Sequence, residues 1–328
     1  ITGACDAMVV DVQCVMQNLA NVAKCFHTKL ITTHPIAKME QENVIHIEFD
    51  EHHAIEDAKR IVKMAIDNFQ NRSADVLIPQ HKCSQIAGFS VESIKYHLGG
   101  SFRGSYYTLN DNIINGRIRG VAGVVGCNNA RQQHNNASIT IIKELIKNDV
   151  LVLTTGCNAI ACGMHGLLTP ESAGVYAGPG LAEVCETVGI APVLHLGSCV
   201  DNSRILLAAT EVVKAGGLGN DICDWPVAGS APEWMSEKAI SIGHYFVTSG
   251  VYTVFGGLLQ TTGAPVFQNY LFNELEKIYG GMWDMVVDPI EHAHKMIAHI
   301  DKKRKELGID KARERVLMDM ADRQALEL

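Results

Sequence analysis

Short apolar runs alternate along the chain with stretches whose apolar residues recur at helical spacing, a pattern that predicts an α/β protein with parallel sheets. Between residues 54 and 69 the apolar positions recur every three or four residues, which predicts one long amphipathic helix. Apolar runs bounded by turn residues predict strands at positions 6–12, 30–33, 46–49, 120–125, 150–154 and 192–196. The apolar segment 245–255 fits either a helix or a strand.

This alternation is interrupted between residues 71 and 100, where Pro79, Gly88 and a Gly99-Gly100 pair break the apolar pattern. We place a domain boundary there, with residues 1–75 in a first domain and 76–328 in a second. Both domains are predicted to be Rossmann-like, with parallel sheets. From Asp288 onward the charged and apolar residues alternate at helical spacing, which predicts a helical tail on the second domain.

Composition narrows the class of protein. The chain has 328 residues, 47% hydrophobic and 20% charged, which suits about two globular domains. The net charge of −8 argues against a nucleic-acid partner, and the one basic run, at 302–305, is predicted to be a solvated helix face. No apolar run is long enough to predict a membrane span.

The start of the chain and its ten cysteines raise further expectations. Ile1 is not an initiator methionine, so we expect a processed chain or one that begins partway into a longer protein. The first residues lack the pattern of a secretory signal, which predicts a reducing, cytoplasmic location. In such a compartment the cysteines are buried thiols, catalytic thiols or metal ligands rather than disulfides.

Four of these cysteines follow predicted strands directly. Each lies in a short turn between a strand and a predicted helix, and they are Cys14, Cys127, Cys157 and Cys199. Ligands of open parallel sheets bind at the carboxyl ends of the strands, so four such thiols could converge on one site. Glycines just before the last three would let the backbone approach a bulky ligand, and nearby helix amino termini would favour the thiolates.

Thiolates without CxxC pairs favour a metal cluster held by several elements over a structural zinc site, and soft sulfur suits iron–sulfur and nickel chemistry. The alternative is packing, because cysteine is among the most often buried residue types, and the repetition alone does not decide between the two. The six cysteines without this arrangement are interpreted as core or incidental thiols: Cys5, Cys25, Cys83, Cys162, Cys185 and Cys223.

A second candidate segment spans residues 231–238. Pro232 and the acidic residues after it are typical of a helix start. Lys238 would share an apolar helix face with Trp234 and Ile242. Such a lysine either extends to solvent or acts as a buried cation that stabilises developing negative charge, and spacing alone favours the first.

Other motifs give weaker signals. The histidine pairs at 52–53 and 292/294 fit chance surface pairs better than metal sites, and His195 is predicted to be a core histidine. The glycines at 216–219 follow a predicted helix and are interpreted as a helix stop, not a dinucleotide motif.

Longer motifs resemble those of one family. The segments 11–14, 27–29, 120–129, 155–162, 197–204 and 231–238 are similar, in this order, to the catalytic subunit of anaerobic nickel-containing carbon monoxide dehydrogenase. The resemblance extends from Ile1 to about Ile309. It implies the reversible conversion of CO and water into CO₂, two protons and two electrons at a nickel–iron–sulfur cluster with one additional iron.

The resemblance also implies residue roles. Cys14, Cys127 and Cys157 would bind cluster irons, and Cys199 would bind nickel. Lys238 would donate a hydrogen bond to the carboxylate-like intermediate, which reverses the interpretation from spacing, and Ile242 would line the apolar wall beside CO.

Members of this family are about twice as long, so the resemblance implies a carboxy-terminal half. Residues 1–75 would be the end of a middle Rossmann-like domain that is incomplete at its amino terminus. The 4Fe–4S relay clusters, the His and Cys that hold the outer iron and the acid/base histidine would belong upstream of Ile1. His27 is no substitute because it follows Cys14, so the chain alone is not expected to turn over.

Expected partners of this family are a ferredoxin-like electron acceptor and a second copy of the chain, and an association with acetyl-CoA synthase stays open. Two alternative functions remain at this point. One is a hybrid-cluster protein of the hydroxylamine-reductase type, which would need neither nickel nor the 197–203 segment. The other is a non-catalytic scaffold that would tolerate loss of Cys199 and Lys238.

Overall fold

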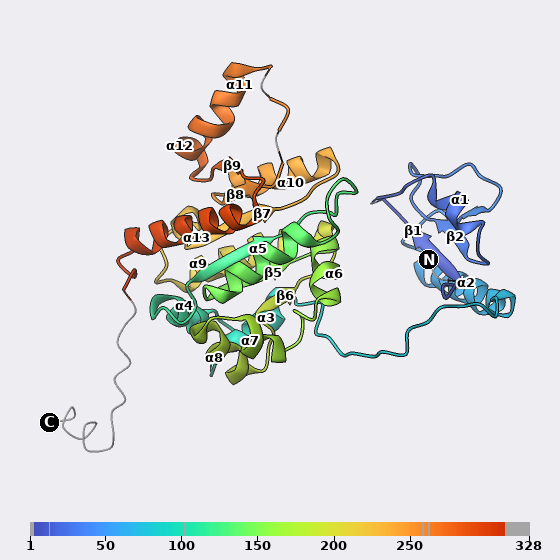
Figure 1. The fold of residues 1–328 in the computed structure, drawn as a ribbon, viewed down its shortest axis with the longest axis horizontal. Helices are drawn as coiled ribbons and strands as arrows, with labels where there is room; N and C mark the ends of the chain where they lie inside the picture. The colour runs from blue at the N-terminus through green and yellow to red at the C-terminus, as the bar shows by residue number, and fades with distance from the viewer. Residues whose placement is uncertain (1–2, 13, 102, 258, 262, 312–328) are drawn as a thin grey trace. The chain divides into compact units, whose positions relative to one another are not determined.

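The computed structural model describes residues 3–12, 14–101, 103–257, 259–261 and 263–311. The chain forms two compact units, Ile1–Cys83 and Ser84–Leu328, so the division falls later than residue 75 (Figure 1). Gln13 in the first motif and residues 312–328 of the expected tail lie outside the described residues. As predicted, the fold is α/β with two parallel sheets.

The first unit contains a three-stranded parallel sheet in the order β1-β2-β3. Its elements are β1 (Ala7–Val10), α1 (Leu19–Ala23), β2 (Lys29–Thr32), β3 (Val44–His46), α2 (Ala54–Asn68) and a 3₁₀ turn (Phe69–Asn71). Strand β3 ends at His46, where the sequence predicted a strand to begin. Beyond it, Ile47 and Phe49 still donate backbone hydrogen bonds to β2 and to Thr33, so the chain stays extended for a few residues.

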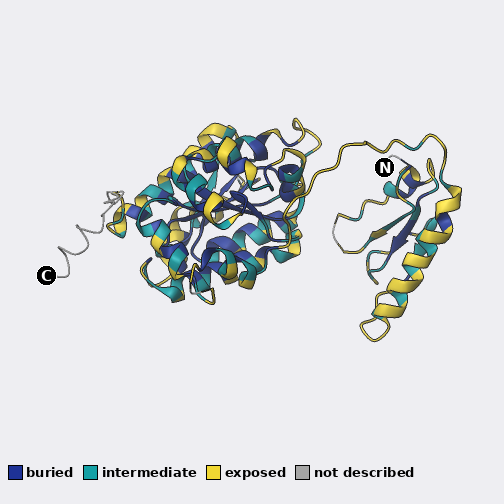
Figure 2. Ribbon diagram, turned by 90° about the horizontal axis from the view of Figure 1, so that it is seen from below, coloured by how far each residue is buried: buried dark blue, intermediate teal, exposed yellow. Residues whose placement is uncertain are grey.

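Helix α2 matches its prediction in length but not in burial. Its apolar residues divide between two sides, because Ile61 is half-buried while Ile55 is 72% and Ile66 67% exposed. Figure 2 shows the exposed colour along most of this helix. The hydrophobic pattern therefore predicted the helix but not which of its sides is covered.

The second unit is built on a six-stranded parallel sheet in the order β6-β5-β4-β7-β8-β9. The strands are β4 (Gly120–Val124), β5 (Val150–Thr154), β6 (Val193–His195), β7 (Val227–Ala231), β8 (Tyr252–Phe255) and β9 (Trp283–Met285). This order, outward in both directions from the first strand, is that of a doubly wound dinucleotide-type fold. Its topological switch point lies between β4 and β7, where ligands bind such sheets.

Helices cover both faces of this sheet. The α-helices of this unit are α3 (Val91–Leu98), α4 (Tyr107–Ile114), α5 (Asn136–Lys147), α6 (Gly156–Met164), α7 (Glu171–Tyr176), α8 (Pro179–Val188), α9 (Asn202–Ala215), α10 (Glu237–Thr248), α11 (Pro265–Asn269), α12 (Leu275–Tyr279) and α13 (Pro289–Glu306). Of these, α11 and α12 project away from the layers (Figure 1). The ambiguous segment 245–255 thus contains the end of α10 and all of β8. No helix in the described ranges has the length and apolar character needed to cross a membrane.

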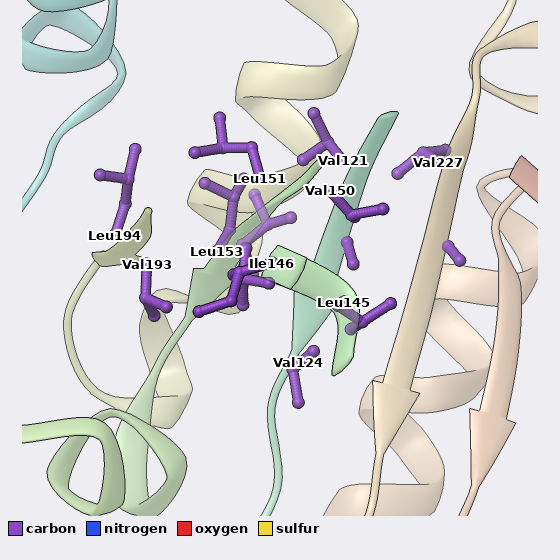
Figure 3. Packing of buried hydrophobic residues seen from close by; sticks show 14 of the residues in the cluster. Val121, Val124, Leu145, Ile146, Val150, Leu151, Leu153, Val193, Leu194 and Val227 are labelled. Carbon is purple, nitrogen blue, oxygen red and sulfur yellow. The ribbon is translucent and has the colours of Figure 1, made fainter. Parts of the chain in front are cut away.

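The core of this unit lies between the sheet and its helices. Figure 3 shows Val121, Val150 and Leu151 of β4 and β5 packed with Leu145 and Ile146 of α5. Every residue of β4 and β5 is buried, which explains why both strands are continuous apolar runs in the sequence. Glycines in β4 allow close approach of helices, because a Cβ at Gly120 would lie 2.6 Å from the Cγ2 atom of Ile300 in α13.

Helix α13 forms as predicted, but two of its polar residues are buried rather than solvated. Arg304, in the basic run, donates to the backbone carbonyls of Ile113, Arg119 and Ile309. The ring of His292 lies 2.7 Å from Ser230 Oγ through Nε2 and 3.1 Å from the Val286 carbonyl oxygen through Nδ1. The surface interpretation is therefore wrong for these two residues, which face Ser230 of β7 and the Arg119 carbonyl before β4, whereas Lys302, Lys305 and His294 are exposed as predicted.

Two histidines of α13, the buried His292 and the half-buried His299, predict a loss of stability in mild acid. Burial lowers the pKa of His292 to about 4 and that of His299, which stacks on Tyr252, also to about 4. The unfolded chain therefore binds more protons between pH 6.5 and 4, so stability is complete above this window and falls as the pH decreases through it. We expect each histidine to cost about 2 kcal/mol between pH 7 and pH 5.

Tryptophan fluorescence during urea unfolding measures this loss, because Trp225, Trp234 and Trp283 all belong to the second unit. The exposed His294 provides the control, since His294→Gln should keep the same pH dependence. An equal free energy of unfolding at pH 7 and pH 5 would contradict the prediction.

Candidate metal centre at the carboxyl edge of the sheet

Three of the four candidate cysteines lie at the carboxyl ends of strands in the second unit's sheet, which we call the carboxyl edge. Cys127 follows β4, Cys157 follows β5 in the first turn of α6, and Cys199 follows β6 at the start of a 3₁₀ turn (Cys199–Asp201). Because β5 pairs with both β4 and β6, these turns are neighbours. All three cysteines are partly exposed. Cys14 belongs to the first unit, where it is exposed and has a φ of 51°, uncommon for a residue other than glycine.

The expectation that each cysteine lies at a helix amino terminus holds for Cys157 and Cys199 only. Helix α5 begins at Asn136, well after Cys127, and α1 begins at Leu19, after Cys14. The residues after Cys127 form a turn instead, in which the side chain of Asn128 donates to His134 and to Asn135. Two of the four cysteines therefore lie at the start of a helix or 3₁₀ turn.

The turns that carry Cys157 and Cys199 pack directly against each other. Gly156 donates its backbone N–H to the Gly197 carbonyl at 2.9 Å and has a φ of +57°. A Cβ at Gly156 would lie 3.2 Å from the Cβ of Cys199. Thr155, just before Gly156, donates its hydroxyl to Oδ1 of the buried Asn202 at 2.5 Å. Glycine is thus needed where these two thiol-bearing turns meet.

The turn that carries Cys127 is fixed by hydrogen bonds to Glu233, which follows β7. Cys127 donates its backbone N–H to the Glu233 carbonyl at 2.9 Å, and Asn129 donates its own to Glu233 Oε2 at 2.7 Å. This contact was not predictable from the sequence, because Glu233 has the pattern of an acidic residue in a first helical turn. In the structure α10 begins only at Glu237, and residues 232–236 form a connection along the sheet edge.

Lys238 is brought to the same edge by this connection. Its Nζ donates to Cys199 Sγ at 3.3 Å, so the interpretation from spacing, a lysine extending to solvent, is wrong. The contact joins residues distant in sequence, which is why spacing could not predict it. Ile242, one turn later in α10, is half-buried against the main core. An ammonium in contact with a sulfur stabilises negative charge there.

The segment that leads into the second unit is attached near these turns. The side chain of Gln85 donates to the carbonyl of Gly163 in α6 at 2.8 Å. Gly88 and Phe89 both donate backbone N–H groups to the carbonyl of His195, the last residue of β6. The chain therefore enters the second unit beside the elements that carry Cys157 and Cys199.

Two of the other cysteines are core thiols. Burial raises the pKa of Cys162 to about 12 and that of Cys185 also to about 12, so neither is a thiolate near neutral pH. Burial also raises the pKa of the partly exposed Cys223. Cys5, Cys25 and Cys83 are exposed and lie outside the strand-end turns of the second unit.

Four of the buried polar atoms that lack hydrogen-bond partners in the described chain lie around the same turns, while the others are spread over the rest of it. Thr154 Oγ1, Asn128 Oδ1, Asn158 Nδ2 and Glu233 Oε1 are all of this kind, and each belongs to or contacts a turn that carries a cysteine. Such atoms are rare in folded proteins because they cost desolvation energy. Their presence is consistent with a polar group that binds at this edge.

The donor set fits a cluster better than a single ion. Among the described residues, no three His, Cys, Asp or Glu side chains lie close enough together to hold one metal ion. Thiolates that each bind a different metal atom of a cluster need not be that close. Soft sulfur donors on separate turns, with a cation beside one of them, therefore fit a sulfur-rich metal cluster.

Comparisons with known proteins show the family of this chain. A family model described as the Prismane/CO dehydrogenase family matches residues 1–290. Carbon monoxide dehydrogenase 1 of Methanosarcina mazei is 49% identical over 311 residues, which cover 94% of this chain and 48% of that protein. The beta subunit of carbon monoxide dehydrogenase/acetyl-CoA synthase from Moorella thermoacetica is 39% identical over 322 residues, 94% of this chain and 47% of that subunit.

A solved structure shows the same fold. The nickel-free carbon monoxide dehydrogenase of Thermococcus sp. AM4, produced without the CooC maturase, superimposes with a TM-score of 0.85 at 48% identity. The match covers 94% of this chain and 48% of that one. The chain thus spans about half the length of the relatives that it matches.

Proposed function

Because the chain belongs to the Prismane/CO dehydrogenase family, we propose that it forms part of a carbon monoxide dehydrogenase and holds most of that enzyme's CO-oxidising cluster. The reaction is CO + H₂O ⇌ CO₂ + 2 H⁺ + 2 e⁻. The observation that carries the proposal is the contact of Lys238 Nζ with Cys199 Sγ at the edge where three strand-end cysteines lie.

The proposed ligands are the four cysteines of the strand-end pattern. Cys14, Cys127 and Cys157 would hold irons, and Cys199 would hold nickel. The packing of the Cys157 and Cys199 turns and the orphaned polar atoms around them support this assignment. When bound, a nickel–iron–sulfur cluster supplies Lewis-acid sites for CO and water and accepts two electrons.

The chain's own residues would orient substrate and stabilise charge. The Lys238 ammonium, which contacts Cys199, would donate a hydrogen bond to the substrate oxygen that becomes negative as CO is converted to CO₂. Ile242, on the same face of α10, would provide an apolar wall that excludes water beside the carbon atom.

Cofactors and partners follow the same proposal. We propose 4Fe–4S clusters on other parts of the complete protein, a ferredoxin-like electron acceptor and a homodimer. An acetyl-CoA synthase is a candidate partner because the Moorella thermoacetica relative is the beta subunit of such a complex. A reducing cytoplasm and anaerobic growth would keep the cysteine thiols and the cluster intact.

The test is an assay of the protein at its native polypeptide length, purified without oxygen. We expect CO-dependent reduction of methyl viologen and no hydroxylamine reduction. Hydroxylamine reduction without CO oxidation would favour the hybrid-cluster alternative. A protein that retains its metals but shows neither activity would overturn the proposal.

A further inference from the structure

Glu233 has surroundings that no part of the proposed mechanism uses. Its side chain is 1% exposed, and it is the one buried carboxylate among the residues that the structure describes. Within the same residues, no lysine, arginine or histidine pairs with it. Burying a carboxylate without a cation is costly, so the position requires a compensating role.

Its hydrogen bonds all go to the turn that carries Cys127. The backbone carbonyl of Glu233 accepts from the N–H of Cys127 at 2.9 Å, and Oε2 accepts from the N–H of Asn129 at 2.7 Å. Gly126 approaches so closely that an added Cβ would lie 2.5 Å from the Glu233 carbonyl oxygen. A single residue therefore fixes both ends of the Cys127–Asn129 turn.

The connection at residues 232–236, which contains Glu233, also contacts Gly256 after β8 and leads directly to Lys238. Gly256 donates its backbone N–H to the Ala231 carbonyl at 3.0 Å, and an added Cβ at Gly256 would collide with the Pro232 carbonyl oxygen. Lys238, five positions after Glu233, then contacts Cys199. Residues 231–238 thus link the Cys127 turn to the Cys199 turn.

We infer that Glu233 is a positioning residue that holds Cys127 in the orientation needed to bind its metal, at a fixed distance from Lys238 and Cys199. The inference rests on the proposed function, because it treats Cys127 as a cluster ligand. The buried Oε1 atom, which has no hydrogen-bond partner among the described residues, is an independent observation, since it leaves one acceptor for the O–H group of a water molecule at the site.

Three variants test this role. Glu233→Ala removes the acceptor for Asn129, whereas Glu233→Gln keeps an acceptor of the same shape without the charge. The control is Glu237→Gln, at an exposed carboxylate in the first turn of α10. Tryptophan fluorescence confirms that the second unit of each variant is folded.

Two measurements use the native-length protein without metal. We expect the Asn129 amide to exchange its hydrogen, and the Cys127 thiol to react with a maleimide, about tenfold faster in Glu233→Ala. Both rates should return to within about threefold of wild type in Glu233→Gln and stay unchanged in Glu237→Gln. Unchanged rates in a folded Glu233→Ala variant would overturn the inference.

A third measurement follows iron retention during competition with a chelator. Glu233→Ala should lose iron on the order of 10- to 100-fold more readily, with rescue by Glu233→Gln. If both variants lose iron equally while folded, the charge and not the positioning matters, and the inference is wrong. If wild-type protein binds no iron but the exchange rates change as expected, the proposed function fails while the role of Glu233 in holding Cys127 stands.

Discussion

Replacing Cys199 with alanine is expected to reduce the nickel content and the CO oxidation rate to background while leaving most of the iron in place. The proposal assigns the nickel bond to this thiolate alone, whereas Cys14, Cys127 and Cys157 would continue to hold iron. Metal analysis and CO-dependent viologen reduction, both on anaerobic protein, measure the two effects.

The matched control is Cys223→Ala, because Cys223 is also partly exposed but lies in a turn before β7, away from the strand-end cysteines. It should retain metals and activity. A Cys199→Ala protein with wild-type nickel would show that the thiolate is not the nickel ligand, and activity at the wild-type level would exclude its participation altogether.

Replacing Lys238 with methionine is expected to lower kcat by about 10²- to 10³-fold with little change in metal content. The ammonium would stabilise charge that develops only during the reaction, so its loss affects the transition state more than the cluster. Methionine keeps the length and apolar body of the side chain. Steady-state kinetics with variable CO, together with nickel and iron analysis, separate the two effects.

Lys305→Met provides the control, at an exposed lysine of α13. Loss of metal in parallel with activity in Lys238→Met would mean that the contact with Cys199 serves to hold the cluster and not to stabilise charge. A kcat within about threefold of wild type would remove Lys238 from the mechanism.

Local sequence patterns predicted the scaffold of the site well where burial is uniform. Strands β4 and β5 consist of buried apolar residues between turns, so their positions and the cysteines after them followed from the sequence. Strand β7, by contrast, has the sequence Val-Ala-Gly-Ser-Ala, whose small residues carry little strand preference, and it was not predicted. Without β7, the sequence could not place residues 231–238 beside Cys127.

Local sequence patterns also could not predict contacts between elements, because these contacts join residues that are distant in the sequence. Lys238 has the spacing of a lysine that extends to solvent, and only the folded chain shows its amine beside Cys199. Glu233 has the pattern of an acidic helix start, but in the folded chain it precedes α10 and is buried against Gly126. The resemblance to a family corrected the first interpretation, and no sequence feature indicated the second.

X-ray absorption at the nickel and iron edges of the native-length protein, purified without oxygen, would show whether the chain binds a nickel–iron–sulfur cluster through Cys199. We expect nickel and iron in one sulfur-rich cluster, with sulfur neighbours around nickel that decrease in number when Cys199 is replaced by alanine. Protein without nickel, or with nickel bound only by nitrogen and oxygen, would contradict this expectation.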